Sequence, residues 1–375
     1  MKKVVIAIDS FKGCLPSVEA GKAAAEGIRS VYPECDVICL PIADGGEGML
    51  DVLIMATNGQ EVPISAHDPL MRWRNTYYGI SENGETAFIE MASISGLPLV
   101  PPERRNPMLT TTYGTGEIIR DALERGCRNF IIGIGGSATN DAGLGMLQAL
   151  GFRFSDKEGK EVGTGRGEVL IKVAHIDSTC VHPALNSCRF TVACDVQNPF
   201  YGPEGAAYVF APQKGADREM VEALDAGLQN FAEVIRHTTG KDISHHPGAG
   251  AAGGMGGSLL AFLNAELKPG IQLMLEALDF SNKIKSADLI ITGEGKADRQ
   301  TLMGKVPSGI LAEARKQNIP VILLAGNIED SDELQQAGFE GVFSVNPPFI
   351  SLEEAMRPEV ACKNIQQTVE SICKK

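Results

Sequence analysis

Basic residues are scarce in this sequence relative to acidic ones, with 34 Lys and Arg against 47 Asp and Glu and a formal charge of −13. At long range this charge repels polyanions, so the composition excludes a general nucleic-acid-binding protein. A small anionic substrate would need local basic side chains or a divalent metal ion to offset the overall field. We therefore expect small-molecule partners and no nucleic acid.

The chain also lacks any C-x-x-C pair, although it contains nine cysteines. An odd number of scattered cysteines in a large chain is typical of reduced thiols and argues against a disulfide framework. The apolar run of the N-terminal MKKVVIAIDS ends at Asp9, which is too short for a signal peptide or a membrane span. These features predict a cytoplasmic protein without a membrane partner.

Several catalytic and nucleotide-binding motifs are missing or incomplete. No G-x-x-x-x-G-K-[ST] P-loop occurs, and six scattered histidines give no Ser-His-Asp or Cys-His arrangement. The dinucleotide pattern G-x-G-x-x-G/A is matched at Gly248–Gly254, where no strand precedes it, and at Gly133–Ala138. In the second case the expected acid would be Asp156, which lies in a charged segment that suggests an antiparallel hairpin. A nicotinamide-dependent dehydrogenase stays open as a less favoured alternative.

The length of 375 residues exceeds the roughly 250 to 300 residues of a single core, which predicts two domains. Both chain ends alternate between strands and helices. Near the N-terminus the pattern predicts a strand at 4–8, a helix at 18–31 and a strand at 37–42. Near the C-terminus it predicts strands within ADLIITGEG, IPVILLAGN and GVFSVNPP, with helices at 308–316, 332–337 and 352–373. This alternation is typical of a doubly wound parallel sheet.

The middle of the chain has a different pattern. Strands are predicted within TAFIEMAS, NFIIGI, CRFTVACDV and AAYVFAPQ, a hairpin within GFRFSDKEGKEV, and helices at 114–124, 220–236 and 258–262. We therefore predict an α/β protein with a doubly wound, Rossmann- or flavodoxin-like domain formed by both chain ends, residues 1–68 plus 284–375. A second α/β domain of mixed sheet, residues 69–283, would be inserted between them.

The stretch NFIIGIGGSATNDAGLGML, residues 129–147, places a glycine-rich turn between a predicted strand and a predicted helix. We expect the turn at Gly135, Gly136 and Ser137 to present backbone N–H groups at the positive end of that helix, where phosphate is favoured. The alternative is a connector that needs glycine only for its backbone angles.

Four clusters of glycine and acidic residues follow predicted strands: IDSFKG, ADGGEG, ACDVQNP and ITGEGKADRQT. In open α/β sheets the carboxyl ends of strands line the ligand crevice, and carboxylates beside lysines and free N–H groups suit a magnesium-bound triphosphate. Each acid alone could equally cap a helix or form a turn. Basic residues beside glycine or proline turns could reach a carboxylate or phosphate; they are Lys12, Arg105, Lys214, Lys296 and Lys305.

Long strings of this sequence resemble the bacterial glycerate kinase family, of the type that includes the enzymes of glucarate and glyoxylate utilisation. They include AIDSFKGCLPSVEA, PIADGGEGMLDVL, TTTYGTGEIIRDAL, IIGIGGSATNDAGLGMLQALG, VACDVQNPFYG and LIITGEGKADRQTLMGKVPSGI, and the similarity runs from about residue 2 to residue 345. The resemblance implies transfer of the γ-phosphoryl group of ATP to D-glycerate with Mg²⁺, in a two-domain α/β fold. The sequence departs from the family pattern at Ile8, Gly13, Lys296 and Arg299, which affects individual contacts more than the reaction.

The roles of single residues follow mainly from their chemistry. We assign catalysis to Asp195, Asp298 and Lys12; substrate binding to Asp9, Ser10, Arg105 and Lys214; nucleotide binding to Gly135, Gly136, Ser137, Gly293 and Gly295; and metal binding to Asp44 and Glu294. Which acid is the base and which is the metal ligand stays open. We expect the acids of the two domains to face one another across a cleft that holds Mg-ATP and glycerate.

Three alternatives and one further question stay open at this point. The chain could be a kinase of another small hydroxy acid, the dehydrogenase considered above, or a catalytically silent nucleotide sensor, although the acids of ADGGEG and TGEGKAD argue against the last. The product is expected to be 2-phosphoglycerate. The sequence leaves a homo-oligomer open.

Overall fold

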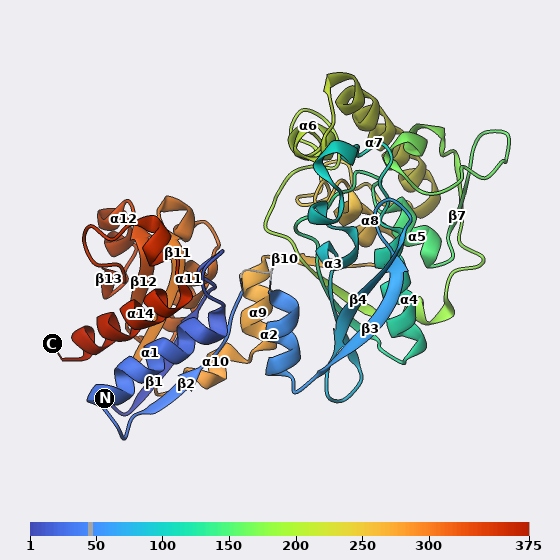
Figure 1. The fold of residues 1–375 in the computed structure, drawn as a ribbon. Helices are drawn as coiled ribbons and strands as arrows, with labels where there is room; N and C mark the ends of the chain where they lie inside the picture. The colour runs from blue at the N-terminus through green and yellow to red at the C-terminus, as the bar shows by residue number, and fades with distance from the viewer. Residues whose placement is uncertain (44–47, 375) are drawn as a thin grey trace. The chain divides into compact units, whose positions relative to one another are not determined.

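The computed structural model describes residues 1–43 and 48–374, and the chain divides into two compact units (Figure 1). The first unit comprises Met1–Asp44 and Ile271–Lys375, and the second comprises Gly45–Gly270. These boundaries differ from the expected 1–68 plus 284–375. Residues 60–67 belong to the second unit because they pair along their whole length with a neighbouring strand of its sheet.

The sheet of the first unit is entirely parallel, with the strand order β13-β12-β11-β1-β2. Its strands are β1 (Lys3–Ile8), β2 (Asp36–Cys39), β11 (Leu289–Ala297), β12 (Val321–Ile328) and β13 (Gly341–Ser344). The chain leaves β1 toward β2 on one side, and β11 lies on the other side. The strand order therefore reverses between β1 and β11, which is where open α/β sheets bind ligands, beyond the carboxyl ends of the strands.

Helices cover both faces of this parallel sheet, as expected for a doubly wound domain. Helices α1 (Ser17–Val31) and α14 (Pro358–Cys373) lie side by side and share a buried cluster with Val4, Ile6 and Ile8 of β1 (Figure 1). Val5 and Ala7, on the opposite face of β1, are also fully buried. Helix α11 (Val306–Arg315) contacts β1, β11 and β12. The remaining helices of this unit are α9 (Gly270–Ala277), α10 (Phe280–Lys283), α12 (Ser331–Gln336), α13 (Leu352–Ala355) and the 3-10 helix η6 (Arg299–Leu302).

The second unit contains a mixed sheet with the order β10-β9-β6-β5-β4-β3. Its strands are β3 (Gln60–His67), β4 (Trp73–Ile80), β5 (Thr86–Glu90), β6 (Asn129–Gly133), β9 (Arg189–Ala193) and β10 (Glu266–Lys268). Strands β5, β6, β9 and β10 are parallel, whereas β3 and β4 add an antiparallel edge. The predicted fold class, a parallel sheet from both chain ends and a second domain with a mixed sheet, is confirmed.

The three helices predicted at 114–124, 220–236 and 258–262 are present in the second unit, which also contains helices that the sequence pattern did not indicate. Its helices are α2 (Met49–Ala56), α3 (Ala92–Ser95), α4 (Tyr113–Glu124), α5 (Leu144–Ala149), α6 (Ala206–Phe210), α7 (Arg218–Thr239) and α8 (Met255–Phe262), with short 3-10 helices at Leu97–Leu99, Pro102–Arg104, Gly167–Lys172, Pro183–Ser187 and Pro212–Lys214. The strand predicted within AAYVFAPQ is wrong, because this segment forms α6. Its alanines are buried and the helix packs against α7, whereas Tyr208 and Val209 are exposed.

The segment around Asp156 forms a turn but only part of the expected hairpin. The Asp156 N–H donates to the carbonyl of Lys160 at 2.9 Å, and Ser155 bridges to Glu161. The strand β7 (Arg153–Ser155) pairs antiparallel with the more distant β8 (His175–Asp177). Asp156 therefore does not follow a second parallel strand, as a dinucleotide-binding motif would require. In the part of the chain that the structure describes, no helix is both long and apolar enough to cross a membrane.

Candidate active site

A cavity of about 420 Å³ lies at the carboxyl ends of β1 and β11, where the strand order of the first unit reverses. Its wall contains four of the predicted site residues, Ser10, Lys12, Glu294 and Gly295. It also contains Lys296 and Lys305, which gives this part of the wall three lysines and one glutamate. In a chain with a formal charge of −13, this cavity is a local basic site of the kind that an anionic ligand needs.

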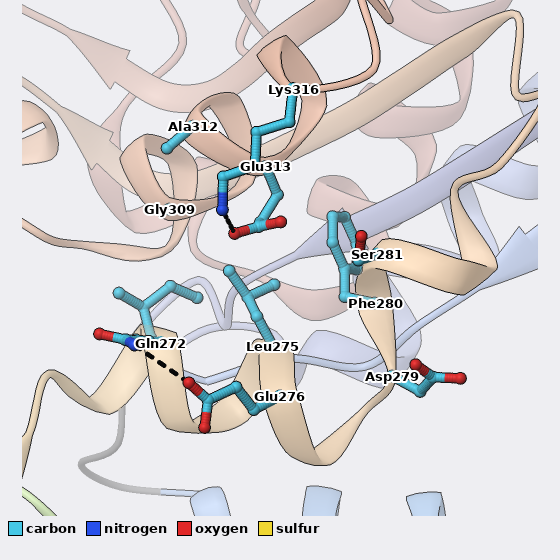
Figure 2. Close-up of a pocket in the computed structure, with 11 residues that line it drawn as sticks. Gln272, Leu275, Glu276, Asp279, Phe280, Ser281, Gly309, Ala312, Glu313 and Lys316 are labelled. Atoms are coloured by element: carbon cyan, nitrogen blue, oxygen red, sulfur yellow. Dashed lines mark hydrogen bonds and ion pairs between the residues drawn. The ribbon is translucent and has the colours of Figure 1, made fainter.

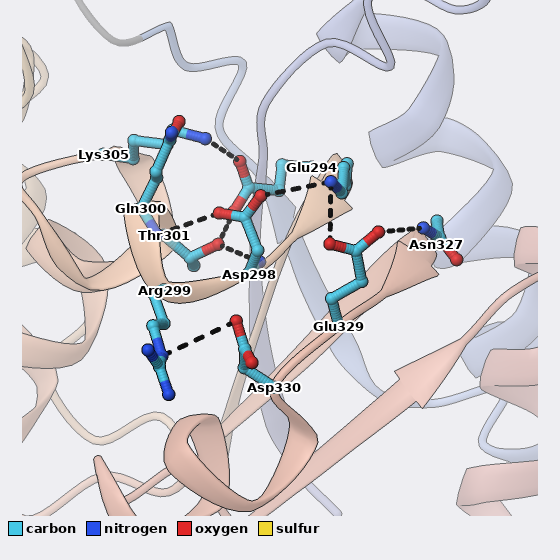
Figure 3. A network of polar contacts seen from close by, with 10 residues as sticks. Glu294, Asp298, Arg299, Gln300, Thr301, Lys305, Asn327, Glu329 and Asp330 are labelled. Atoms are coloured by element: carbon cyan, nitrogen blue, oxygen red, sulfur yellow. Dashed lines mark hydrogen bonds and ion pairs between the residues drawn. The ribbon is translucent and has the colours of Figure 1, made fainter.

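Glu294 is the buried acid of this cavity, with 6% of its surface exposed. The Thr301 hydroxyl donates to its Oε1 at 2.5 Å, and the Lys305 ammonium lies 3.4 Å from its Oε2 (Figure 3). Burial raises the pKa of Glu294, against the opposing effects of Thr301 and Lys305. Glu294 thus has one oxygen held by a hydroxyl and the other beside a lysine, and a carboxylate can accept further contacts at each oxygen.

Asp298 caps a short helix, which is one of the two roles that the sequence left open for it. Its side chain accepts from the Gln300 N–H at 2.8 Å, and its own N–H donates to the Thr301 hydroxyl at 3.0 Å (Figure 3). These reciprocal bonds form a capping box at the start of η6. Burial acts to raise the pKa of Asp298, but the Gln300 N–H and the nearby lysines Lys305 and Lys296 outweigh it and lower this pKa. Asp298 is therefore an ionised N-cap of η6, two residues after Lys296 of the cavity wall.

Asp9 and Gly293 join the two strands at this end of the sheet. The Asp9 N–H donates to the Gly293 carbonyl at 2.9 Å, and the Asp9 carboxylate accepts from the Ser10 N–H at 2.7 Å. A side chain at Gly293 would place its Cβ 2.5 Å from the Leu324 carbonyl of β12. Close strand packing thus explains the glycine at 293, whereas Gly295 lies in the wall of the cavity.

A second polar cluster lies in the second unit around Lys214, which is 2% exposed. Its ammonium donates to the Ser137 hydroxyl at 2.7 Å and to the Thr139 carbonyl at 2.6 Å. Burial lowers the pKa of Lys214 to about 7, and the negative charge of Asp141 opposes this lowering. An ammonium has three N–H donors, so one remains for a further acceptor once these two bonds are made.

The glycine turn before α5 differs from its predicted role. Helix α5 begins at Leu144, so the turn at residues 135–137 does not open it. The N–H groups of Gly143 and Gly145 at that helix end donate to the buried carboxylate of Asp141, at 3.2 Å each. The positive end of α5 is thus already matched by a protein carboxylate. Gly136 has a φ of 71°, so any side chain there is strained whether or not the turn binds phosphate.

Asp141 is the residue that sequence reasoning missed. It is fully buried and also accepts from the N–H and the hydroxyl of Thr112, each at 2.8 Å, which ties α4 to α5. Burial raises the pKa of Asp141 against these hydrogen bonds. An aspartate shortly before a helical pattern is a recognisable cap signal, but a partner from a segment thirty residues away leaves no local trace.

Two further polar side chains near Lys214 lack partners among the described residues. The Thr139 hydroxyl and both amide atoms of Asn140 are buried without a hydrogen bond there, although most buried polar groups are satisfied. Both residues belong to the loop that carries Ser137 and Asp141. The loop therefore holds unused hydrogen-bonding capacity beside a buried lysine.

Two further predicted site residues of the described chain, Arg105 and Asp195, belong neither to the cavity of the first unit nor to the hydrogen bonds of Lys214. Arg105 is partly exposed, and the residue after Lys214 packs against it: a Cβ on Gly215 would lie 2.3 Å from the Arg105 carbonyl. Asp195 is exposed just beyond β9 and accepts from the Gly270 N–H at 2.8 Å. Asp44 lies outside the described residues. The structure thus groups Ser10, Lys12, Glu294 and Gly295 in one unit, and Ser137 and Lys214 in the other.

Another cavity of about 700 Å³ lies between α9, α10 and α11 (Figure 2). Apolar residues of these helices line it together with three acids, Glu276, Asp279 and Glu313, and a single lysine, Lys316, which pairs with Glu313. None of the predicted site residues lines it. Its charge is the opposite of what a phosphate requires, so it is not the candidate site.

A magnesium ion would bind in the cavity of the first unit together with substrate phosphates, because residues 1–43 and 48–374 alone do not supply a complete set of ligands. The described residues contain no group of three or more His, Cys, Asp or Glu side chains that could hold a metal. Mg²⁺ usually binds through one or two carboxylates, water and substrate phosphates. Among the described residues of this cavity, the buried carboxylate of Glu294 is the group that could serve as such a ligand.

Comparison with known proteins identifies the family. The profile of the Glycerate kinase family matches residues 4–375. The chain belongs to the glycerate kinase family. It is 46% identical to the glycerate kinase of Bacillus subtilis (strain 168), over 99% of this chain and 96% of the relative. It is 48% identical to the glycerate 2-kinase of Escherichia coli (strain K12), over 95% of this chain and 93% of the relative.

The fold of this glycerate kinase family member is also found in a solved structure. A crystal structure assigned as glycerate kinase 2 from Salmonella typhimurium LT2 superimposes with a TM-score of 0.91 at 44% identity. It covers 100% of this chain, which covers 97% of it. Membership in a kinase family confirms the resemblance read from the sequence and excludes the dehydrogenase and the silent sensor as leading interpretations.

Proposed function

We propose that this kinase transfers the γ-phosphoryl group of ATP to D-glycerate with Mg²⁺ in the cytoplasm and yields 2-phosphoglycerate. The names of the relatives from Bacillus subtilis and Escherichia coli support glycerate as the acceptor, and the second supports the 2-position. A kinase of another small hydroxy acid is the alternative.

The observation that carries the proposal is the basic cavity at the strand-order reversal of the first unit. Lys12, Lys296 and Lys305 converge on its wall in an acidic chain. Among the described residues, Lys296 is held by two carboxylates, Glu329 at 2.9 Å and Asp298 at 3.5 Å, whereas Lys305 has one carboxylate contact, with Glu294 at 3.4 Å. Two of the three lysines thus have distinct environments, and Lys305 is the one placed to exchange a carboxylate for a phosphate.

The cluster around Lys214 suits the carboxylate of the acceptor. A buried ammonium with one N–H left, the Ser137 hydroxyl and the unpartnered Asn140 amide can together bind a small hydroxy acid. Arg105 would add a second cation from the adjacent segment. Phosphoryl transfer uses both substrates, so we propose that residues of both units take part in it.

The reaction needs charge neutralisation and one proton acceptor. The glycerate hydroxyl oxygen forms the new bond to the γ-phosphorus while the bond from that phosphorus to the β–γ bridging oxygen breaks, and ADP leaves. The hydroxyl proton passes to a carboxylate, for which we propose Asp195 or Asp298. Lys12 would stabilise the transferred group, Asp9, Ser10 and the glycines at 135, 136, 293 and 295 would position the substrates, and Glu294 with Asp44 would hold Mg²⁺, which supplies positive charge to the phosphates.

The lowered pKa of Lys214 predicts a pH dependence. Glycerate binding needs the charged ammonium, so kcat/KM for glycerate should fall as pH rises through about 7, by up to about tenfold per pH unit. The measurement is kcat/KM between pH 6 and 9 at saturating Mg-ATP, with buffers of matched ionic strength. A flat profile across this range would contradict a role for Lys214 in binding the carboxylate.

Substrate choice tests the proposed function. Transfer from γ-labelled ATP to D-glycerate should exceed transfer to L-glycerate or lactate by at least about tenfold in kcat/KM, because a site that pairs with both hydroxyls penalises lactate, which lacks one, and L-glycerate, which has the opposite configuration at C2. Phosphorus NMR of the product distinguishes 2- from 3-phosphoglycerate. Equal rates with lactate would favour another hydroxy acid as the natural acceptor.

A further inference from the structure

The wall of the cavity in the first unit contains two chemically different groups of side chains. Lys12, Glu294 and Lys305 are charged, whereas Leu352, Ala355 and Met356 are apolar. Leu352 begins α13 and Met356 follows its last residue, with the Met356 N–H bonded to the Leu352 carbonyl at 3.0 Å. This four-residue spacing places the two side chains on one side of the helical turn.

The apolar group of side chains is unusually exposed for its composition. Leu352 is 75% exposed and Met356 is 40% exposed, although both are large hydrophobic residues. Phe349, in the same segment, is fully exposed and has a φ of 72°, a conformation that non-glycine residues avoid. Exposed apolar side chains in the wall of a cavity, here Leu352 and Met356, are a feature of ligand-binding grooves.

We propose that Leu352 and Met356 bind the purine ring of the phosphoryl donor by apolar packing, without reading the edge of the base. This inference rests on the proposed function, because it assigns the charged side chains of the same cavity to the phosphates. A nucleotide is the ligand class that combines a polyanion with a flat apolar ring, and the cavity of about 420 Å³ is within the usual range for small-molecule sites.

The two amide side chains in the cavity wall are already engaged. The Asn346 Nδ2 donates to the Gly326 carbonyl at 2.7 Å, and its Oδ1 accepts from Asn364 at 3.2 Å. The Asn327 amide donates to Glu329 at 3.4 Å. The Asn346 amide is engaged at both its nitrogen and its oxygen and is therefore a poor reader of a base edge, so we expect ATP and GTP to have kcat/KM values within about tenfold of one another.

Binding experiments on the whole enzyme separate the base from the phosphates. The double variant Leu352→Ala/Met356→Ala should weaken ADP binding about tenfold, which corresponds to about 1.4 kcal/mol. Inhibition by inorganic tripolyphosphate, which has no base, should not change. Titration calorimetry measures ADP binding, and competition against ATP measures tripolyphosphate. Trp73→Ala, which removes an exposed aromatic side chain from β4 of the other unit, is the matched control, and Met356→Leu should retain wild-type ADP affinity.

The outcomes distinguish this inference from the proposed function. Unchanged ADP affinity in the double variant, or equal losses for ADP and tripolyphosphate, would overturn the base-binding wall. A preference for ATP over GTP of a hundredfold or more would show that the site recognises the edge of the base, which contradicts the inference. If ADP weakens selectively but the wild type transfers no phosphate to glycerate, the inference stands and the proposed acceptor fails.

Discussion

Replacing Lys214 by methionine should lower kcat/KM for glycerate by about a hundredfold or more, the cost of removing one partner of a desolvated charge pair. Methionine keeps much of the length of the side chain but removes the donor that bonds Ser137 and Thr139. The proposed carboxylate partner is lost, while the proposed Mg-ATP site in the other unit should be unaffected. Steady-state kinetics with each substrate varied in turn should show the loss in KM for glycerate and not in KM for ATP.

A matched control and a stability measurement make this test specific. Lys172→Met, at an exposed lysine of the same unit, should leave kinetics unchanged. Below about pH 7, Lys214 is protonated in the folded and unfolded states, and the cost of burying its charge is fully present. Between about 7 and its ordinary pKa of about 10.4 only the unfolded state binds the proton, so the stability of the wild type relative to the variant rises with pH. Equal kcat/KM values for glycerate in Lys214→Met and Lys172→Met would show that Lys214 does not bind glycerate.

Replacing Glu294 by glutamine should lower kcat by about a hundredfold and raise the Mg²⁺ concentration needed for half-maximal rate. Glutamine preserves the shape and can still accept from Thr301, but it removes the negative charge beside Lys305. If Glu294 holds the metal, the loss should be partly recovered at high Mg²⁺. Kinetics over a range of Mg²⁺ concentrations at fixed ATP provide the measurement.

Two comparisons keep this result interpretable. Glu340→Gln, at an exposed carboxylate of the same unit, should change neither kcat nor the Mg²⁺ requirement. Asp298→Asn should retain the cap of η6, because asparagine caps as well as aspartate, so a loss of activity with unchanged melting temperature would identify a chemical role. Normal turnover and Mg²⁺ dependence in Glu294→Gln would show that this buried acid only supports the loop.

The sequence predicts the parallel sheet of the first unit well because its strands are uniform apolar runs next to amphipathic helices. It predicts the second unit less well. Tyr208, Val209 and Phe210 favour a strand by local propensity, yet α6 forms because burial of Ala206 and Ala207 against the rest of the unit decides the conformation. Local preference is weak evidence where a segment is short and packing is tight.

The candidate site shows the same division. Ser10, Lys12, Glu294 and Gly295 were predictable because each lies next to the end of an apolar strand, and parallel strands bring their carboxyl ends together. The pairing of Asp141 with Thr112 and of Lys214 with Ser137 was not, since these bonds join residues far apart in the chain. The glycine turn was misplaced relative to α5 because the pattern does not show how many residues separate a turn from the first helical hydrogen bond.

The position of β1 in the middle of its sheet has a consequence for how the protein is made. Val4 pairs with Leu289 on one side and with Val37 on the other, so this strand gains one neighbour early and the other only after most of the chain exists. At roughly 5 to 20 residues per second, the edge of β1 that pairs with β11 stays without its partner strand for roughly 15 to 60 s of synthesis. The continuous segment between the two halves of the first unit can complete its own sheet during this interval. A ribosome stalled before β11 would thus present one compact folded body behind an N-terminal arm with an unpaired strand edge, a natural binding site for a chaperone.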